Sequence, residues 1–289
     1  MSSEAVAGAR APLDAAALAR ALIRPGGLWR TVTVTESTGS TNADLLAQAA
    51  DGAPEGTVLV TETQTAGRGR MGRTWLSPPG AALMFSVLLR PTAVPPARRG
   101  WLPLLAGVAI ASALRDVTGL DVGLKWPNDV LTGGGKLAGI LAEQSAGTEA
   151  IVAGAGLNVS TRRDELPVET ATSLLLAGAP DLRRDRLLGA VLAEFERLYQ
   201  AWAGPPSSSQ HSSSQHRPSQ HSPGDPDAAG LRDRYRACCV TLGRQVRAEL
   251  PGGGALTGTA LDVDETGSLQ LRTPDGPRTI SAGDIVHLR

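Results

Sequence analysis

A stretch of Pro, Ser, Gln and His divides the chain into two parts. Residues 204–229 contain the consecutive pentads SSSQH, SSSQH and RPSQH and very few apolar side chains. A segment of this composition buries too little apolar surface to offset the conformational entropy lost on folding. It is therefore predicted to be a disordered linker or a loop insertion. The chain is expected to fold as a large unit before this segment and a small unit after it.

The small unit, residues 230–289, has the spacing of an all-β domain. Its short β-prone runs, from QVRAEL to DIVHLR, are separated by the turns PGGG, ETG and PDG. Short strands punctuated by glycine-rich turns predict a small β-barrel of about 50 residues.

The large unit mixes strand-like and helix-like segments and is preceded by a short N-terminal helical segment, residues 1–30. Ser40 or Thr41 is the expected N-cap of a helix carrying Asn42. Since the order of elements is not a strict βαβ repeat, residues 31–203 are predicted to form an α+β domain. The pattern predicts helices at 13–23, 42–50, 101–119 and 182–203, and strands at 31–36, 57–64, 82–90 and 150–160, with short strands also beside KWPND and GGGK.

Composition excludes several classes of protein. The 28 basic and 28 acidic residues balance, which argues against a nucleic-acid binder that works by bulk charge. The longest apolar run, near 102–114, is shorter than the ~20 residues of a membrane span, and no signal peptide is visible. The two cysteines, Cys238 and Cys239, are adjacent and cannot form a disulfide framework. We therefore expect a cytoplasmic protein with no DNA or membrane partner.

Histidine is placed where it cannot support common hydrolytic chemistry. Three of the four histidines, His211, His216 and His221, lie in the pentad repeat, and His287 is third from the end. The sequence therefore offers almost no histidine that could serve in a Ser-His-Asp or Cys-His catalytic system. The sequence also identifies no metal site.

The run GRGRMG at 67–72 matches the bare dinucleotide-binding pattern but lacks its context. That pattern opens a helix, whereas here the two prolines of RTWLSPPG prevent one. GGGK at 133–136 fails as a phosphate-binding Walker loop, because Leu137 stands where Ser or Thr must be. The alternating arginines and glycines of this run favour a loop that binds phosphate groups. A flexible basic loop exposed to solvent is the alternative interpretation.

Lysine and asparagine are scarce and fall in a few motifs. Lys125 and Lys136 are the only lysines among 28 basic residues, and asparagine occurs three times. These residues occupy STN (40–42), KWPND (125–129), GGGK and GLN (156–158). Turn formation and a solvated strand edge are the alternative explanations. Together the motifs favour charge stabilisation without a protein nucleophile, as needed to join a carboxylate to the α-phosphate of ATP.

The motifs STNADLL, TETQTAGRGRMGRTW, KWPNDV, GGGKLAGIL and VAGAGLNV resemble biotin protein ligases in order and spacing across residues 31–202. The resemblance implies a class II synthetase-like mixed sheet with flanking helices, followed by a small SH3-like β-barrel. Without an N-terminal DNA-binding domain, the chain is similar to the monofunctional ligases of this family.

The resemblance also implies a reaction, a ligase reaction that forms a carbon–nitrogen bond. Biotin and ATP, with Mg²⁺, would give biotinyl-5′-AMP and pyrophosphate. The biotinyl group would then pass to one lysine on the biotin carboxyl carrier domain of a carboxylase.

Site residues follow by the same resemblance. Asp129 would orient or deprotonate the incoming lysine, and Lys136, Arg68 and Arg70 would act in catalysis. The implied biotin-binding residues are Ser40, Thr41, Asn42, Gln64, Arg68, Gly69, Arg70 and Lys136. The implied nucleotide-binding residues are Arg73, Trp75, Lys125, Asn128 and Asn158.

Two other functions stay open at this point. A lipoate or octanoate ligase has a similar catalytic fold, although the arginine–glycine loop and the C-terminal domain argue against it. A biotin-binding regulator that modifies no carrier is the non-catalytic alternative. A homodimer formed through an exposed strand of the large domain is a further expectation that periodicity does not decide.

Overall fold

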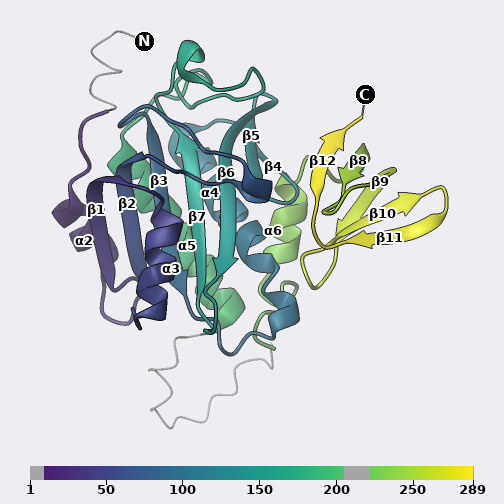
Figure 1. Cartoon of the computed structure of the whole chain (residues 1–289), viewed down its shortest axis with the longest axis horizontal. Coiled ribbons are helices and arrows are strands. Elements are labelled where there is room, and N and C mark those ends of the chain that lie inside the picture. The colour runs from purple at the N-terminus through teal and green to yellow at the C-terminus, as the bar shows by residue number, and fades with distance from the viewer. Residues whose placement is uncertain (1–9, 205–221, 289) are drawn as a thin grey trace.

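The computed structural model describes residues 10–204 and 222–288, which form a large mixed domain and a small β domain (Figure 1). The α+β prediction is confirmed. Most of the predicted linker lies outside the described residues. Its described end returns to the large domain, where the Gly224 amide donates to the Trp202 carbonyl (2.7 Å) and the Trp202 indole donates to the Gly224 carbonyl (2.8 Å).

A seven-stranded sheet forms the centre of the large domain, in the order β1-β2-β3-β7-β6-β5-β4. The β1 and β2 strands are parallel and the other neighbours are antiparallel. The strands are β1 (Thr31–Thr38), β2 (Thr57–Gln64), β3 (Ala82–Leu89), β4 (Val122–Lys125), β5 (Asp129–Thr132), β6 (Gly135–Gln144) and β7 (Ile151–Asn158).

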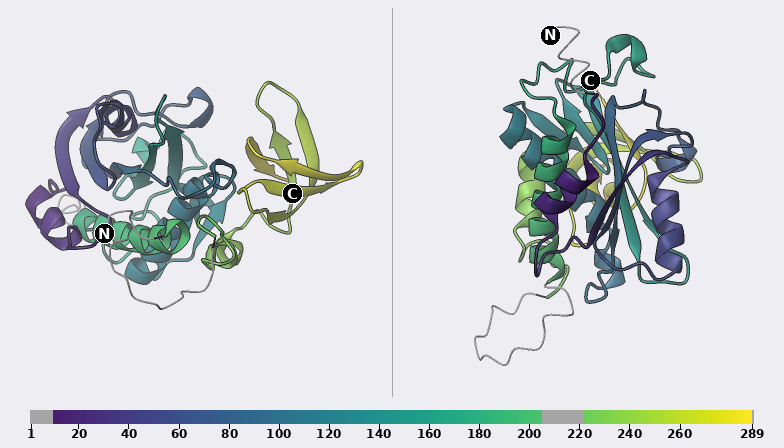
Figure 2. Two further views of the ribbon diagram at one scale, coloured as in Figure 1. Left: turned by 90° about the horizontal axis from the view of Figure 1, so that it is seen from below. Right: turned by 90° about the vertical axis from the view of Figure 1, so that its left-hand side faces the viewer.

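Helices cover both faces of this sheet (Figure 2). The α2 (Ala15–Leu22), α4 (Trp101–Thr118) and α5 (Arg184–Ala203) helices pack on one face over the main apolar core. The α3 helix (Thr41–Ala50) covers the other face, where Leu45 and Ala49 bury against Leu59, Leu88 and Val152. These helices and strands match the predicted ones to within a few residues.

The α4 helix is the most apolar of the helices in the described residues. The segment Pro96–Thr118 is long enough to span a membrane and contains an 18-residue stretch of mean hydropathy 1.3, but 67% of that stretch is buried inside the protein. The helix ends at Gly119, which adopts a left-handed conformation (φ 70°) that glycine takes at little cost. Its apolar character is accounted for by packing between the sheet and its neighbouring helices.

The parallel pair β1–β2 determines where the polar motifs meet. The two strands are connected through α3, and their register pairs Thr38 with Gln64, so their carboxyl ends lie at the same edge of the sheet. Ser40 caps α3 just beyond β1 by accepting a hydrogen bond from the Ala43 amide. This arrangement brings the STN motif next to the end of TETQ.

The small domain is an antiparallel sheet in the order β11-β10-β9-β8-β12. The prediction of an all-β domain is confirmed, but the sheet is open: within residues 222–288 its edge strands β11 and β12 do not pair with each other. The strands are β8 (Gln245–Glu249), β9 (Ala255–Val263), β10 (Leu269–Thr273), β11 (Gly276–Ile280) and β12 (Asp284–His287).

One helix was not predicted from the sequence. The α6 helix (Leu231–Cys238) precedes β8 and packs against α4 and β4 of the large domain. Leu231, Tyr235 and Cys238 form its buried face, a helical spacing that was present in the sequence.

Candidate active site

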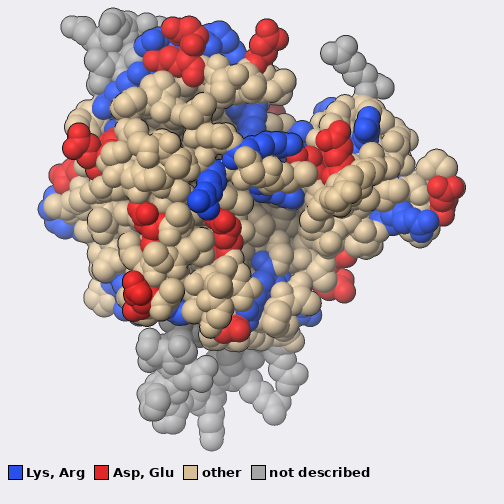
Figure 3. Space-filling view, viewed as in Figure 1, with Lys and Arg blue, Asp and Glu red and all other residues tan. Residues whose placement is uncertain are grey.

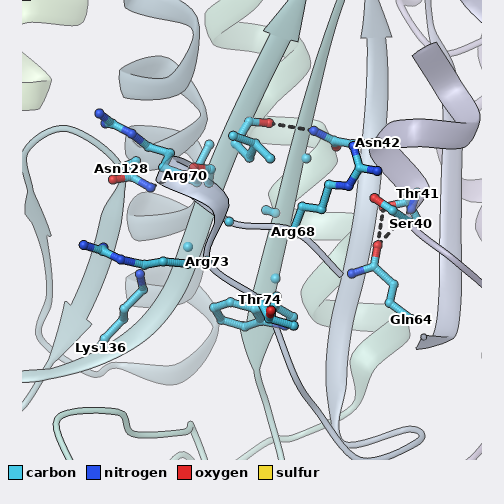
Figure 4. Close-up of a pocket in the computed structure, with 18 residues that line it drawn as sticks. Ser40, Thr41, Asn42, Gln64, Arg68, Arg70, Arg73, Thr74, Asn128 and Lys136 are labelled. Atoms are coloured by element: carbon cyan, nitrogen blue, oxygen red, sulfur yellow. Dashed lines mark hydrogen bonds between the residues drawn. The ribbon is translucent and has the colours of Figure 1, made fainter. Parts of the chain in front are cut away.

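A pocket opens at the edge of the sheet where β1 and β2 end, and β6 and β7 form its floor (Figure 4). It brings together most of the predicted site residues. Neutral polar side chains gather at one end and the cations Arg70, Arg73 and Lys136 at the other, and the Arg68 side chain reaches toward Asn42 and Thr41 at the neutral end. The lining residues are Ser40, Thr41, Asn42, Gln64, Arg68, Gly69, Arg70, Arg73, Thr74, Trp75, Asn128, Lys136, Gly139, Ile140, Leu141, Gly154, Ala155 and Gly156.

At the neutral end, Thr41 holds the side chain of Gln64 in place. The Thr41 amide donates to Gln64 Oε1 at 2.8 Å, and Thr41 Oγ1 lies 3.1 Å from the same oxygen. The Gln64 side chain is thereby oriented so that its amide nitrogen is left for the pocket. Ser40 and Thr41 are both buried.

A buried hydrogen-bond network supports this end from behind. Both N–H groups of the Asn42 side chain are used, one by the Leu141 carbonyl (3.1 Å) and one by Glu143 Oε2 (2.7 Å). Ser86 Oγ lies 2.6 Å from Asn42 Oδ1 and 2.7 Å from Thr41 Oγ1. Gly154 makes room for the network, because a Cβ there would lie 2.0 Å from Asn42 Oδ1.

The arginine–glycine run folds as a tight hairpin over the pocket. Its ends are joined by bonds from Trp75 N to Gly67 O (2.9 Å) and from Gly69 N to Arg73 O (2.7 Å). A Cβ on Gly67 would lie 2.5 Å from the Trp75 carbonyl oxygen, so this crossing requires glycine. The hairpin directs Arg70 and Arg73 to the cationic end, whereas Arg68 extends toward Asn42 and Thr41 (Figure 4).

The small domain contacts this hairpin directly. Arg70 Nη2 donates to the Gly283 carbonyl at 3.1 Å, and Arg73 forms an ion pair with Asp284. Burial lowers the pKa of the Arg70 guanidinium, against the raising effects of Asp284 and Asp129. The loop that covers the pocket is therefore linked to the small domain.

Trp75 lies across the floor of the pocket. Its ring packs so closely on β6 and β7 that a Cβ on Gly156 would lie 2.4 Å from it, and one on Gly139 3.2 Å. The indole N–H is buried and has no hydrogen-bond partner among the described residues. A buried, unpaired donor beside an open pocket is a candidate ligand contact.

Lys136 lies at the cationic end and is paired with an acid. Its Nζ is 2.6 Å from Asp129 Oδ1, and both side chains are partly exposed. Its backbone is held on both sides by bonds to Thr170 O (2.7 Å) and from Thr172 N (2.9 Å). Asn128 lies nearby, with its side-chain N–H donated to the Ile140 carbonyl at 2.9 Å.

Three predicted residues do not line this pocket. Asp129 does not line the pocket, but its carboxylate forms an ion pair with Lys136, which does. Lys125 lies in an adjoining small cleft beside Pro127 and Tyr235. Asn158 is buried and donates to the Thr172 carbonyl at 2.9 Å, so it supports the segment that pairs with Lys136.

The contributors to the site that were not predicted from the sequence include Ser86, Glu143, Gly283 and Asp284, besides pocket-lining residues such as Thr74, Leu141 and Gly156. Ser86 is the single polar residue of the strand sequence ALMFSVLL, a signal that could have identified it. Asp284 had no such signal, because its contact with Arg73 joins two domains.

Charge around the pocket is unevenly distributed. Figure 3 shows basic side chains gathered between the large and the small domain, near the hairpin. Within residues 10–204 and 222–288, no three His, Cys, Asp or Glu side chains are grouped closely enough to hold a metal ion. The pocket is thus suited to an anion, and any divalent cation there must bring most of its ligands with it.

Comparisons with known proteins agree with this geometry. Residues 33–159 match the Biotin/lipoate A/B protein ligase family, and residues 241–288 match the Biotin protein ligase C terminal domain. A biotin–[acetyl-CoA-carboxylase] ligase of Mycobacterium tuberculosis is 42% identical over 97% of both chains. One of Paracoccus denitrificans is 32% identical over 86% of this chain and 97% of that protein.

A similar solved structure is a biotin protein ligase from Aquifex aeolicus in complex with biotin and ATP. Its TM-score to this chain is 0.67 at 27% identity, and the match covers 90% of this chain and 100% of the Aquifex chain.

Proposed function

The chain belongs to the biotin protein ligase family, and we propose that it activates biotin with ATP and transfers the biotinyl group to a lysine of a biotin carboxyl carrier domain. One observation carries this proposal: a single pocket has neutral hydrogen-bonding groups at one end and cations at the other. Biotin has the matching polarity, with a ureido ring at one end and a carboxylate at the other. The named function of the Mycobacterium and Paracoccus relatives supports the same assignment.

In the first half-reaction, a biotin carboxylate oxygen attacks the α-phosphorus of ATP. A phosphorus–oxygen bond forms to the carboxylate, and the bond to pyrophosphate breaks. Both reactants are anionic, so the protein must offset their repulsion and hold them in line. Lys136, Arg68 and Arg70 are the cations that the fold places around the shared site.

Lys136 is proposed to hold the biotin carboxylate and the α-phosphate oxygens. The Lys136 ammonium is paired with Asp129 at 2.6 Å. An arriving anion competes with Asp129 for Lys136, and the displaced carboxylate becomes available for the second step. Formation of the adenylate would thereby free Asp129 to act as the base.

In the second half-reaction, the carrier lysine attacks the acyl carbon. A carbon–nitrogen bond forms, the bond from carbon to the phosphate oxygen breaks, and AMP leaves. The attacking amine must first lose a proton, because its unperturbed pKa of about 10.4 keeps it protonated at neutral pH. Asp129 is the proposed group that orients it and accepts this proton.

Magnesium is expected to enter with the nucleotide. Mg²⁺ in ATP sites usually keeps several waters and binds substrate phosphates with one or two carboxylates. The carboxylates near the pocket include Asp129, Glu143 and Asp284, and each already has a partner: Lys136, Asn42 and Arg73. These residues fit an ion carried on the phosphates, where it would neutralise the leaving pyrophosphate.

The lipoate-ligase alternative is less well supported. The C-terminal domain matches a biotin protein ligase domain, and the neutral end of the pocket offers several hydrogen-bonding groups, more than a dithiolane ring can use. Pyrophosphate release with biotin, lipoate or octanoate is the test. Release with biotin, followed by label on a carrier domain, is expected. Adenylate formation without transfer to any carrier would favour the regulator instead.

Location and assembly are further parts of the proposal. Cys238 and Cys239 are both free and buried, which supports the expected reducing cytoplasm. The homodimer stays a prediction, with β1 and β4 as the edge strands of the large sheet.

A further inference from the structure

We propose that Arg10 is a positioning residue for Lys136, because it fastens the loop formed by residues 160–172, and this loop fixes the backbone of Lys136. The inference deepens the proposed function and rests on it. Arg10 lies far from Lys136 in the chain and does not line the pocket. It acts through the loop.

The last part of the 160–172 loop is bonded to the first part of β6. The Lys136 amide donates to the Thr170 carbonyl (2.7 Å), and the Thr172 amide donates to the Lys136 carbonyl (2.9 Å). On its other side Lys136 pairs with Leu131 of β5. The backbone position from which the Lys136 ammonium reaches Asp129 is therefore set by the loop on one side and by β5 on the other.

Arg10 holds the first part of the same loop with four hydrogen bonds. Its Nη1 donates to Glu165 Oε1 at 3.2 Å and its Nη2 to Glu165 Oε2 at 2.6 Å. Nη2 also donates to the Ser160 carbonyl (3.0 Å), and Nε donates to the Ser160 hydroxyl (3.3 Å). The Arg10 and Glu165 side chains are only 21% and 13% exposed. A two-pronged arginine–carboxylate pair of this kind adds geometric specificity as well as energy.

A second arginine connects the two parts of the loop. Arg163 lies in the same short turn as Glu165 and donates to the Ala171 carbonyl at 2.8 Å. Ala171 forms a parallel bridge with Lys136. Direct contacts therefore lead from Arg10 to the Lys136 backbone.

The segment that carries Arg10 is itself anchored to the large domain. The Leu13 amide donates to Glu62 Oε1 at 2.8 Å, and Arg184 Nη2 donates to the Ala11 carbonyl at 2.7 Å. Arg184 and Glu62 also pair with each other at 2.6 Å, and the Arg184 side chain is 1% exposed. This buried ion pair, between α5 and β2, gives Arg10 a fixed base.

Pyrophosphate release by Arg10→Gln tests the inference. Lys136 is proposed to act on the carboxylate and the α-phosphate, whereas the ureido ring is proposed to bind at the neutral end, and no residue of the loop lines the pocket. We therefore expect kcat to fall about tenfold and the KM for biotin to change less than about twofold. In a Lys136→Ala background, the same change at Arg10 should lower the remaining rate by less than about twofold, because the group that it positions is gone.

Amide hydrogen exchange gives a readout that does not depend on activity. Arg10→Gln should speed exchange at the Lys136 and Thr172 amides by about tenfold, because the loop that pairs with β6 is loosened. Exchange at the Thr41 amide, which donates to Gln64 at the neutral end, should keep its wild-type rate. Arg10→Lys, which keeps the charge but loses the fork, should show the same pattern with smaller changes.

Arg99→Gln is the matched control. Arg99 is also largely buried and combines an ion pair, with Glu149, and a hydrogen bond to a backbone carbonyl, that of Val94 (3.2 Å). Glu149 lies between β6 and β7, at the opposite end of β6 from Lys136. Both readouts should stay at their wild-type values in this variant, even if its melting temperature falls as much as that of Arg10→Gln.

Unchanged kcat or unchanged amide exchange in Arg10→Gln, equal losses in Arg99→Gln, or additive losses in the Lys136→Ala background would overturn the inference. Wild-type protein that releases no pyrophosphate with biotin would instead overturn the proposed function, so the two failures are distinguishable.

Discussion

Lys136 Nζ lies 2.6 Å from Asp129 Oδ1, across neighbouring strands at the cationic end of the pocket. The pair joins the two motifs that hold the scarce lysines of this chain. It also couples the group proposed to bind the reacting anions to the group proposed to take the proton in the second step.

Replacing Lys136 with arginine should cripple the first half-reaction although the charge is kept. A planar guanidinium cannot take the place of a compact ammonium between Asp129, Gly139 and the Trp75 ring. We expect kcat/KM for pyrophosphate release to fall by about 100-fold. Lys125→Arg, at the lysine outside the pocket, should lose far less. Near-normal activity in Lys136→Arg would contradict the assigned role.

Adding one methyl group at Gly156 should displace Trp75. The new Cβ would lie 2.4 Å from the indole ring, and such overpacking costs about 1–3 kcal/mol. Gly156→Ala is expected to weaken ligand binding in the pocket, measured by titration calorimetry with biotin and with ATP.

Gly189→Ala is the control for this change, because Gly189 lies in α5 and a Cβ added there would have nothing within 4 Å. It should leave binding intact and raise stability by about 0.5–1 kcal/mol. Equal binding by both variants would argue against a role for the Trp75 ring.

Removing the charge of Asp284 should loosen the hairpin over the pocket. Arg73 is largely exposed, so its ion pair with Asp284 is worth about 0.5 kcal/mol after solvent screening. Asp284→Asn should speed tryptic cleavage within residues 67–73 by about twofold, and biotin with ATP should restore protection. Asp262→Asn, which breaks the Arg236 ion pair elsewhere in the small domain, should not change this cleavage.

Cys238 should be unreactive in the folded protein. Burial raises the pKa of its thiol to about 12, and since the thiolate is the nucleophile, little of it exists at pH 8. Because the folded pKa lies above the unfolded value, this group also removes stability as pH rises from about 9 toward 12. Disulfide-exchange reagents should modify Cys238 only after denaturation. Rapid labelling at pH 8 would mean that α6 opens readily.

Much of this architecture could be predicted from local patterns. The β2 strand is predicted at 57–64 and has those bounds, and Ser40 caps α3 as its residue type suggests. Short-range periodicity and capping act within one element, so the sequence carries them directly.

What escaped prediction depends on pairing between distant segments. Ser86 matters only because β3 places it behind Thr41, 45 residues away in the chain. Asp284 matters because a second domain docks on the hairpin. Scarcity marks Lys125 and Lys136 equally, but the two lie at different places around the β4–β5–β6 strands and only Lys136 lines the pocket.

The two hydrogen bonds between Trp202 and Gly224 mark a place where extra residues can be inserted into the chain. The backbone leaves the large domain and rejoins it at one place, and both ends are fastened by those two contacts. A fluorescent protein or an affinity tag spliced between residues 205 and 221 would therefore start and finish at neighbouring positions. Such a fusion offers a way to attach a reporter to this ligase without touching either terminus or the pocket.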